Sequence, residues 1–337
     1  MVTVNLGMLH YLLDHIYGAL MHRSRISTPF FSRGWGGTKL EMLEKMIGPS
    51  HMARVAFLVP KCVAPHRMAC VLHLAGTGDH TFERRLRLGG PLLKENIATM
   101  VLERSGSNSV FPSMDKDIQC CSVVQNFCVS DLLLLGRATI EESRGLLHWM
   151  YSEAGFSKMG ICGLSMGGVH AAMVGSLHPT PVATFPFLSP HSAAVAFREG
   201  ILKYGTAWEA LRGDLATQKA EMTLEEVRER LRNVLSLTEV TCFPIPKIPN
   251  AVIFVSATDD GYIPKHSVLE LQKAWPGSEV RWVTGGHVSS FCPMVNSEGL
   301  LLKALIDYRG RSLHCDRDIA QAQEIVLQIV KILFFQL

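Results

Sequence analysis

The sequence has little net charge, because 33 lysines and arginines stand against 30 aspartates and glutamates in 337 residues. It has no basic stripe interleaved with aromatic residues, the usual sign of a nucleic-acid-binding surface, so we expect no nucleic-acid partner. It also has no run of about 20 apolar residues, so we expect no membrane-spanning helix. With 47% hydrophobic residues, the chain can bury a sizeable core.

Cysteine is present, but not in the patterns of disulfide frameworks or metal sites. The nine cysteines are odd in number and include no CxxC pair and no Cys/His spacing typical of zinc. We therefore expect free thiols in a reducing, intracellular compartment, and neither a metal nor a cofactor. His73, Asp79 and His80 lie close along the chain, but their spacing matches no standard metal site. We expect them to be solvated or hydrogen-bonded loop groups.

Residues 1–35 form an N-terminal segment whose pattern predicts an amphipathic helix. Apolar residues recur at helical spacing, while Asp14, His15 and Gly18 fall toward the other side. The segment lacks the basic start and small-residue cleavage site of a secretory signal. Three interpretations stay open: a helix packed on the domain, a membrane-surface helix making peripheral contact through residues 1–25, and an organelle-targeting segment.

The central part of the chain, residues 36–308, alternates apolar strands with helical stretches. This alternation predicts an α/β fold with a largely parallel sheet flanked by helices. Residues 190–246 interrupt the alternation with charged helical sequence, and we expect a helical lid insertion there. Residues 309–337 form a C-terminal tail. The predicted strands are 54–60, 69–76, 97–103, 158–163, 181–189, 250–260 and 279–286, and the predicted helices are 82–96, 130–155, 166–177, 264–275 and 298–309.

A G-x-S-x-G motif, Gly163-Leu164-Ser165-Met166-Gly167, lies between the predicted strand 158–163 and the predicted helix 166–177. A serine at such a turn adopts strained dihedral angles, and glycines two residues away on either side let the strand and the helix pass closely. The turn lifts the hydroxyl out of the sheet and points backbone N–H groups toward its target. Ser165 is therefore predicted to be a catalytic nucleophile rather than an incidental turn residue.

A serine nucleophile needs a base and an acid that orients the base, in the chain order serine, acid, histidine. Asp259 and Asp260 follow one late strand, and His287 follows the next. Asp260 precedes Pro264 by the spacing common in such enzymes, so Asp260 is preferred as the acid and Asp259 is the alternative. The predicted catalytic residues are therefore Ser165, Asp260 and His287.

An oxyanion hole is also required, and it needs two backbone donors. One donor is expected from the residue after the nucleophile, Met166, and the other from the loop after the strand 69–76. Gly76 permits a close approach of that loop, so the amide of Thr77 is the predicted second donor.

Several longer segments resemble one branch of the α/β-hydrolase superfamily, the family of α/β-hydrolase-domain-containing protein eighteen and its plant relatives. The matching segments are RGWG (33–36), HLAGTGDH (73–80), SDLLLLGRATIEESRGLLHW (130–149), GLSMGG (163–168), LSPHS (188–192) and GGHVSSF (285–291). The resemblance implies a serine hydrolase with a Ser165–Asp260–His287 triad, associated with an organelle membrane. It also implies lipid acyl esters as substrates, with a phospholipid deacylase acting on a mitochondrial lipid such as cardiolipin as one candidate.

Two regions depart from the family pattern. After the strand 97–103 the family continues with a Pro/Tyr/Gly turn and basic residues, whereas this chain has an irregular segment over 104–130. The sequence over 292–337 also departs from the pattern. Our hypothesis is that these segments come from an imperfect gene model or a splice variant, and transcript sequencing through both would test it.

Three functions are compatible with the sequence. The leading one is a hydrolase of carboxylic esters that works through an acyl-serine intermediate. An acyltransferase would use the same residues but pass the acyl group to an alcohol or a lysolipid. A catalytically inactive, hydrolase-like binding module is the third, although such proteins usually lose the serine, the histidine or an oxyanion glycine.

Overall fold

The protein is built around a seven-stranded sheet with the order β1-β3-β2-β4-β5-β6-β7. The computed structural model describes residues 6–23, 28–36, 54–79, 82–103, 128–156, 158–217 and 222–290. β1 runs antiparallel to β3, and the other neighbouring pairs are parallel, as the alternating pattern predicts. The strands are β1 Val55–Leu58, β2 Ala69–Leu74, β3 Ile97–Leu102, β4 Lys158–Leu164, β5 Ala183–Phe187, β6 Ile253–Ala257 and β7 Glu279–Val283.

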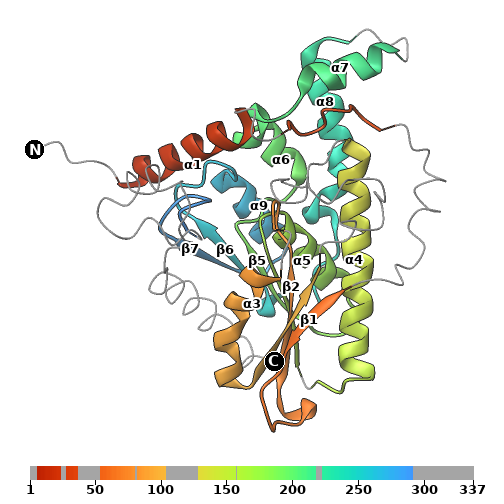
Figure 1. Cartoon of the computed structure of the whole chain (residues 1–337), viewed down its shortest axis with the longest axis vertical. Coiled ribbons are helices and arrows are strands. Elements are labelled where there is room, and N and C mark those ends of the chain that lie inside the picture. The colour runs from red at the N-terminus through yellow and green to blue at the C-terminus, as the bar shows by residue number, and fades with distance from the viewer. Residues whose placement is uncertain are drawn as a thin grey trace, which may run out of the picture.

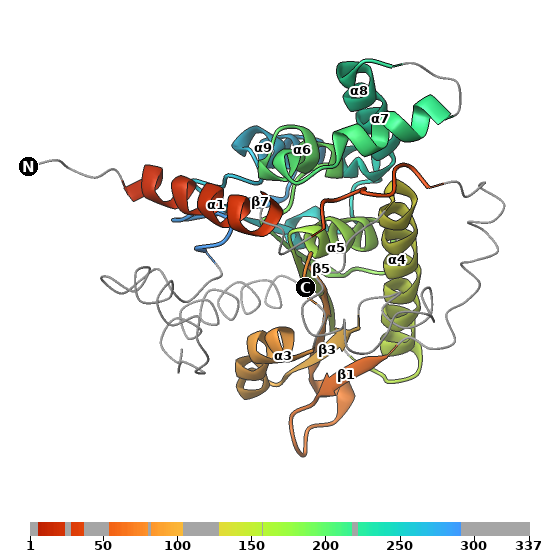
Figure 2. The same cartoon turned by 45° about the horizontal axis from the view of Figure 1, so that its top comes forward.

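Helices cover both faces of the sheet (Figures 1 and 2). On one face, α4 (Val129–Ser152), α5 (Met166–Leu177) and α9 (Lys265–Ala274) pack on the sheet. On the other face lie α3 (Glu83–Gly89) and η2 (Gly90–Glu95). β2, β3 and β5 are buried along their whole length, which explains their continuous apolar runs, because strands covered on both faces do not alternate.

The chain between β5 and β6 is helical, as the sequence over 190–246 predicts. Its charged sequence packs through an apolar side that buries Leu211, Leu215 and Val227. Figure 1 shows α7 and α8 beyond one end of the sheet. The elements are α6 Ala193–Arg198, η4 Ile201–Tyr204, α7 Trp208–Thr217, α8 Leu224–Leu235, η5 Ser236–Thr238, η6 Val240–Cys242 and η7 Pro249–Ala251.

Residues 28–36 are anchored in this helical insertion. The amide of Phe30 donates to the carbonyl of Gly205 at 2.8 Å. The indole of Trp35 donates to the carbonyl of Leu211 at 2.9 Å, and its amide donates to Asp214 Oδ2 at 2.7 Å. Residues 28–36, which include the RGWG segment, therefore pack against the helical insertion.

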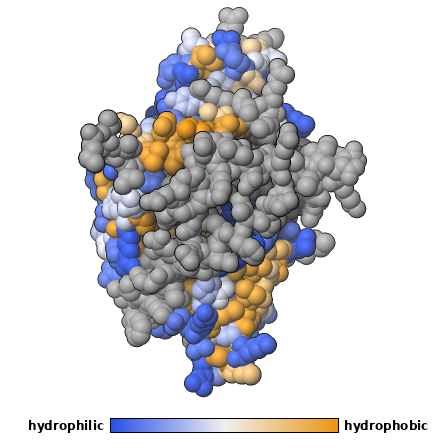
Figure 3. Space-filling view, turned by 60° about the vertical axis from the view of Figure 1, so that its left-hand side comes forward, coloured by the Kyte–Doolittle hydropathy of each residue, from blue (hydrophilic) through white to orange (hydrophobic). Residues whose placement is uncertain are grey.

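The N-terminal helix α1 (Leu6–Arg23) faces the domain with its polar side, the reverse of the orientation expected for an amphipathic helix packed on a domain. Asp14 is fully buried, while Leu12 is 51% exposed and Leu20 is 48% exposed. Figure 3 shows the resulting apolar band across this side of the molecule. The physical reason is that the underlying loops present backbone N–H groups, which a carboxylate satisfies and a leucine does not. Of the helices described, none is both long and apolar enough to cross a bilayer.

Three segments named above fall wholly or mostly outside the described residues. The predicted helix 298–309 and the tail 309–337 lie there, as does most of the irregular segment 104–130.

The predicted helix 82–96 divides into α3 and η2 at Gly90, because Pro91 cannot donate a helical backbone hydrogen bond.

Candidate active site

Ser165 lies at the sharp turn between β4 and α5. The strand ends at Leu164 and the helix begins at Met166, so a single residue makes the connection. Ser165 has φ 55° and ψ −116°, a conformation that costs a non-glycine residue on the order of 1–3 kcal/mol. Such strain at one half-buried serine is the geometry of a nucleophile elbow.

The two motif glycines keep this turn tight. A Cβ on Gly163 would collide with the backbone of Gly167. A Cβ on Gly167 would lie 2.8 Å from the carbonyl oxygens of both Leu74 and Ala75. The strand, the helix and the loop after β2 therefore meet at separations that only glycine allows.

The predicted acid and the predicted base come together after the ends of β6 and β7. His287 Nδ1 donates to Asp260 Oδ2 at 2.8 Å. Asp260 Oδ1 accepts from the amides of Tyr262 and Ile263, both at 2.8 Å. The side chain of Asp260 is only 3% exposed. The carboxylate is thus fixed by its own loop and aimed at the imidazole, which is the arrangement that an orienting acid requires.

Asp259 points elsewhere. Its Oδ2 accepts from the hydroxyl of Thr258 at 2.6 Å, and its carboxylate lies against Gly7 of α1. Of the two adjacent aspartates, Asp260 is the one that contacts His287.

The imidazole of His287 is largely enclosed, with its side chain 12% exposed. It stacks on the ring of Tyr262 with centroids 4.7 Å apart. Burial works against its protonated form, but the negative charges of Asp260 and Asp14 outweigh burial and raise the pKa of His287 above its ordinary value. The site therefore favours the imidazolium that forms when a base takes a proton.

Ser165, Asp260 and His287 all follow strands at the carboxyl edge of the parallel sheet. The structure joins Asp260 to His287 directly, but within its described residues it shows no hydrogen bond between Ser165 Oγ and His287. Catalytic hydrogen bonds are often long without substrate and tighten on binding. The structure therefore brings Asp260 and His287 together, and Ser165 lies at the same edge of the sheet.

The two predicted oxyanion donors lie beside the elbow. Met166 is the first residue of α5, where amides have no partner inside the helix. Thr77 follows Gly76, whose Cβ would lie 2.8 Å from the carbonyl oxygen of Leu164. The loop after β2 thus runs directly along the turn that carries Ser165.

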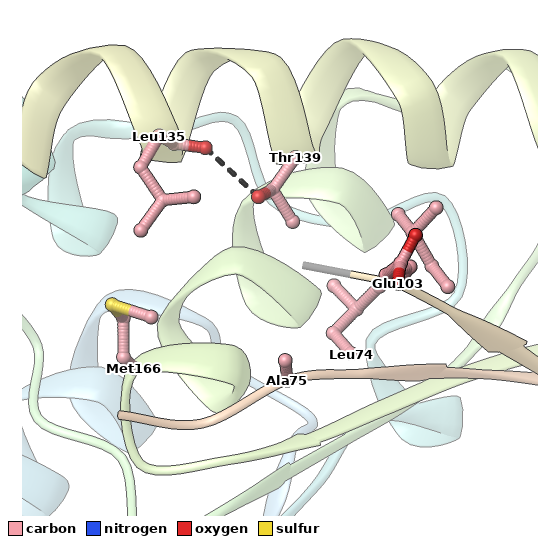
Figure 4. A pocket seen from close by; sticks show the side chains of 7 residues that line it. Leu74, Ala75, Glu103, Leu135, Thr139 and Met166 are labelled. Carbon is pink, nitrogen blue, oxygen red and sulfur yellow. Dashed lines mark hydrogen bonds between the residues drawn. The ribbon is translucent and has the colours of Figure 1, made fainter. Parts of the chain in front are cut away.

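A small pocket opens beside Met166 (Figure 4). Met166 closes it on the elbow side, and Leu135 and Thr139 of α4 close it opposite. The hydroxyl of Thr139 is hydrogen-bonded within α4, because it donates to the carbonyl of Leu135 at 2.8 Å. Leu74, Ala75, Leu102 and Glu103 complete the lining.

Sequence reasoning missed Asp14. Its carboxylate, on α1, accepts hydrogen bonds from the amides of His287 at 2.6 Å, Gly261 at 2.9 Å and Val288 at 2.9 Å. A single acidic residue on the polar side of an amphipathic helix gives no sign of partners more than 240 residues away. The one local signal is the stripe of small and polar residues to which it belongs, with Gly7, His10 and Gly18.

Comparison with protein families identifies the chain. The model of the family described as "Alpha/beta hydrolase domain containing 18" matches residues 38–219 and 214–307. The chain belongs to this family. The match includes Ser165, Asp260 and His287, and it agrees with the mostly parallel sheet and the elbow.

Individual relatives are more distant. An uncharacterized protein of Mycobacterium tuberculosis (strain ATCC 25618 / H37Rv) is 26% identical over 156 residues, which cover 44% of this chain and 32% of the relative. The chain thus spans about a third of the length of the curated relatives that it matches. Among solved structures, Est1E from Butyrivibrio proteoclasticus with bound ferulic acid is 12% identical at a TM-score of 0.48, covering 84% of this chain and 95% of that one. An α/β serine hydrolase homologue from Coxiella burnetii is 11% identical at a TM-score of 0.45, covering 83% and 93%.

In this family member, the loop after β2 is held by a buried ion pair. Arg85 Nε lies 2.9 Å from Asp79 Oδ2, and both side chains are at least nine-tenths buried. Arg85 also donates to the carbonyl of Leu102. Asp79 therefore fixes the loop that carries Thr77, while His73 is buried within β2 and His80 lies outside the described residues.

Proposed function

We propose that this protein is a serine hydrolase that cleaves carboxylic esters of lipids through an acyl-serine intermediate. One observation carries the proposal: the Asp260–His287 pair, joined at 2.8 Å, stands at the same sheet edge as a serine held at φ 55°. A strained serine and an oriented imidazole at one edge are the parts that acyl transfer needs.

The chemical roles follow from this geometry. Ser165 Oγ attacks the ester carbonyl while His287 Nε2 takes the hydroxyl proton, and Asp260 keeps the proton on Nδ1. The amides of Met166 and Thr77 stabilise the oxyanion. His287 then gives its proton to the departing alcohol as the C–O bond breaks. Water, deprotonated by His287, attacks the acyl-serine, releasing the carboxylic acid and restoring Ser165.

One apolar surface supports a lipid ester. The outward face of α1 exposes several large apolar residues, including Leu12 and Ile16, which favours peripheral contact with a lipid surface. We include in the proposal a phospholipid as substrate and an organelle membrane, such as that of the mitochondrion, as the site of action.

Covalent labelling with a fluorophosphonate probe tests the nucleophile. Ser165 Oγ would form a bond to phosphorus as the P–F bond breaks and fluoride leaves, with the serine proton passing to His287. We expect labelling of the wild type and its loss in Ser165→Ala and in His287→Ala. Ser152→Ala is the matched control, because Ser152 is an exposed serine at the end of α4, and it should label normally.

Product analysis with phospholipid vesicles then tests the reaction. Free fatty acid and lysolipid would support the hydrolase. Acyl transfer to an added lysolipid, without fatty acid release, would instead support an acyltransferase. A folded wild type that takes no label would overturn the proposal in favour of an inactive binding module.

A further inference from the structure

One buried carboxylate ties the two catalytic loops together. Asp14 Oδ2 accepts from the amides of Gly261 and His287, and Asp14 Oδ1 accepts from the amide of Val288. Gly261 directly follows Asp260. A residue of the N-terminal helix therefore links the loop that carries the acid to the loop that carries the base.

Glycines make room for this link. A Cβ on Gly286 would lie 2.5 Å from Asp14 Oδ2. A Cβ on Gly261 would lie 3.1 Å from the Cβ of Asp14. Across the same interface, a Cβ on Gly18 would collide with Ile201 of η4. α1 is thus seated directly on the catalytic loops.

The charge of Asp14 also reaches the imidazole. The carboxylates of Asp260 and Asp14 both favour protonated His287. Burial raises the pKa of Asp14 itself, and the three amide hydrogen bonds oppose that rise. Titratable groups near Asp14 include His10 and Tyr17 on α1, Asp259, Asp260 and Tyr262 after β6, and His287 after β7. Tyr11 and His15 of α1 lie on the side of Tyr204 of η4.

We propose that Asp14 is a positioning residue for His287, which holds the base loop against the acid loop and adds a second negative charge beside the imidazolium. The inference rests on the proposed function, in which His287 is the base. Asp14 exchanges no proton in the reaction. The serine proton moves to His287 Nε2, and the other imidazole proton stays on Nδ1, where it is donated in the hydrogen bond to Asp260.

The test measures the rate of fluorophosphonate labelling of the full chain between pH 5 and pH 9. Labelling needs neutral His287, so the rate rises with pH through the pKa of His287. Asp14→Asn removes one negative charge, so the pKa of His287 should fall. The acid limb of the profile, in which the labelling rate rises with pH, should therefore move to lower pH. The plateau rate should drop about tenfold or more, because hydrogen bonds to a charged group are lost.

Asp259→Asn is the charge-matched control, since Asp259 lies beside α1 but does not contact His287. Its profile should match the wild type. A merely structural role for Asp14 would lower the plateau without moving the acid limb, and that result would overturn the inference, as would an unchanged profile. An unlabelled wild type would instead overturn the proposed function itself.

If Asp14→Asn does not fold, Gly286→Ala carries the test. It keeps every charge and pushes on the Asp14 carboxylate. A lowered plateau together with an acid limb shifted to lower pH would support the inference, because the displaced carboxylate would act less on the imidazole. A lowered plateau with an unchanged acid limb would indicate a merely structural role and would overturn it. A wild-type plateau would overturn it.

Discussion

At the residue scale, the adjacent residues Asp259 and Asp260 have different hydrogen-bond partners. Asp260 Oδ2 accepts a hydrogen bond from His287 Nδ1, and Asp260 Oδ1 accepts hydrogen bonds from two backbone amides. Asp259 Oδ2 instead accepts from the hydroxyl of Thr258, and the Asp259 carboxylate lies against Gly7 of α1. Substitutions at these two neighbouring positions can therefore be compared directly, because each removes one negative charge from the same loop.

Asp260→Asn should abolish most activity while leaving the fold intact. The asparagine Oδ1 can still accept from Tyr262 and Ile263, but its NH₂ group would meet Nδ1 and force the wrong imidazole tautomer. We expect kcat for ester hydrolysis to fall by about 10⁴-fold, as in other triads with this change. Asp259→Asn should stay within a fewfold of the wild type. Comparable losses in both variants would contradict the assignment of Asp260.

The sequence was sufficient to prefer Asp260 but not to find Asp14. The preference came from a local spacing to Pro264, and local spacing has a local cause: the turn after Asp260 presents two amides to its carboxylate. The contacts of Asp14 span 247 to 274 residues of sequence. They depend on where α1 docks, which no pattern within α1 specifies.

At the element scale, the elbow requires three pieces of backbone to meet. β4, α5 and the loop after β2 come together around Gly163 and Gly167. This convergence was predictable, because the G-x-S-x-G spacing exists to allow it. The docking of α1 was not predictable in the same way, because burial of Asp14 against backbone amides overrides the apolar pattern of the helix.

Gly163→Ala should destabilise the fold, because the new methyl group overlaps the backbone of Gly167. Overpacking of this kind costs roughly 1–3 kcal/mol, and the displaced turn should also slow the labelling of Ser165. Gly145→Ala is the matched control. Gly145 lies in α4 with nothing within 4 Å of its added Cβ, so alanine there should stabilise by about 0.5–1 kcal/mol.

Urea unfolding of the two variants, followed by circular dichroism, measures both effects. We expect the free energy of unfolding to fall in Gly163→Ala and to rise in Gly145→Ala, although both variants replace glycine by alanine. Equal stabilisation by both alanines would show that the elbow relaxes freely, and the close-packing explanation of the motif glycines would fail.

At the scale of the whole molecule, the sheet encloses an ionisable group that the reaction does not use. His73 of β2 is 2% exposed, and its Nε2 has no hydrogen-bond partner among the residues described. Burial, with the nearby positive charge of Arg85, lowers the pKa of His73 to about 3. The folded protein therefore holds this imidazole neutral over the physiological range.

This burial should make the whole fold sensitive to acid. Below the ordinary histidine pKa of about 6.5, the unfolded chain binds a proton at position 73 that the folded chain refuses. The free energy of unfolding is therefore unaffected by protonation of His73 above pH 6.5. It decreases as the pH falls toward 3, because only the unfolded chain gains the proton. Between pH 6.5 and pH 5 the loss amounts to about 2 kcal/mol, at 1.36 kcal/mol for each pH unit.

His73→Leu should remove that loss, because leucine has a similar volume and takes no proton. The difference between the free energies of unfolding at pH 8 and pH 5, from urea titrations, should shrink by about 2 kcal/mol relative to the wild type. His66→Leu provides the control, since His66 is exposed in the turn before β2 and its loss should leave the difference unchanged. An equal pH dependence in His73→Leu and the wild type would mean that His73 does not stay neutral in the folded protein.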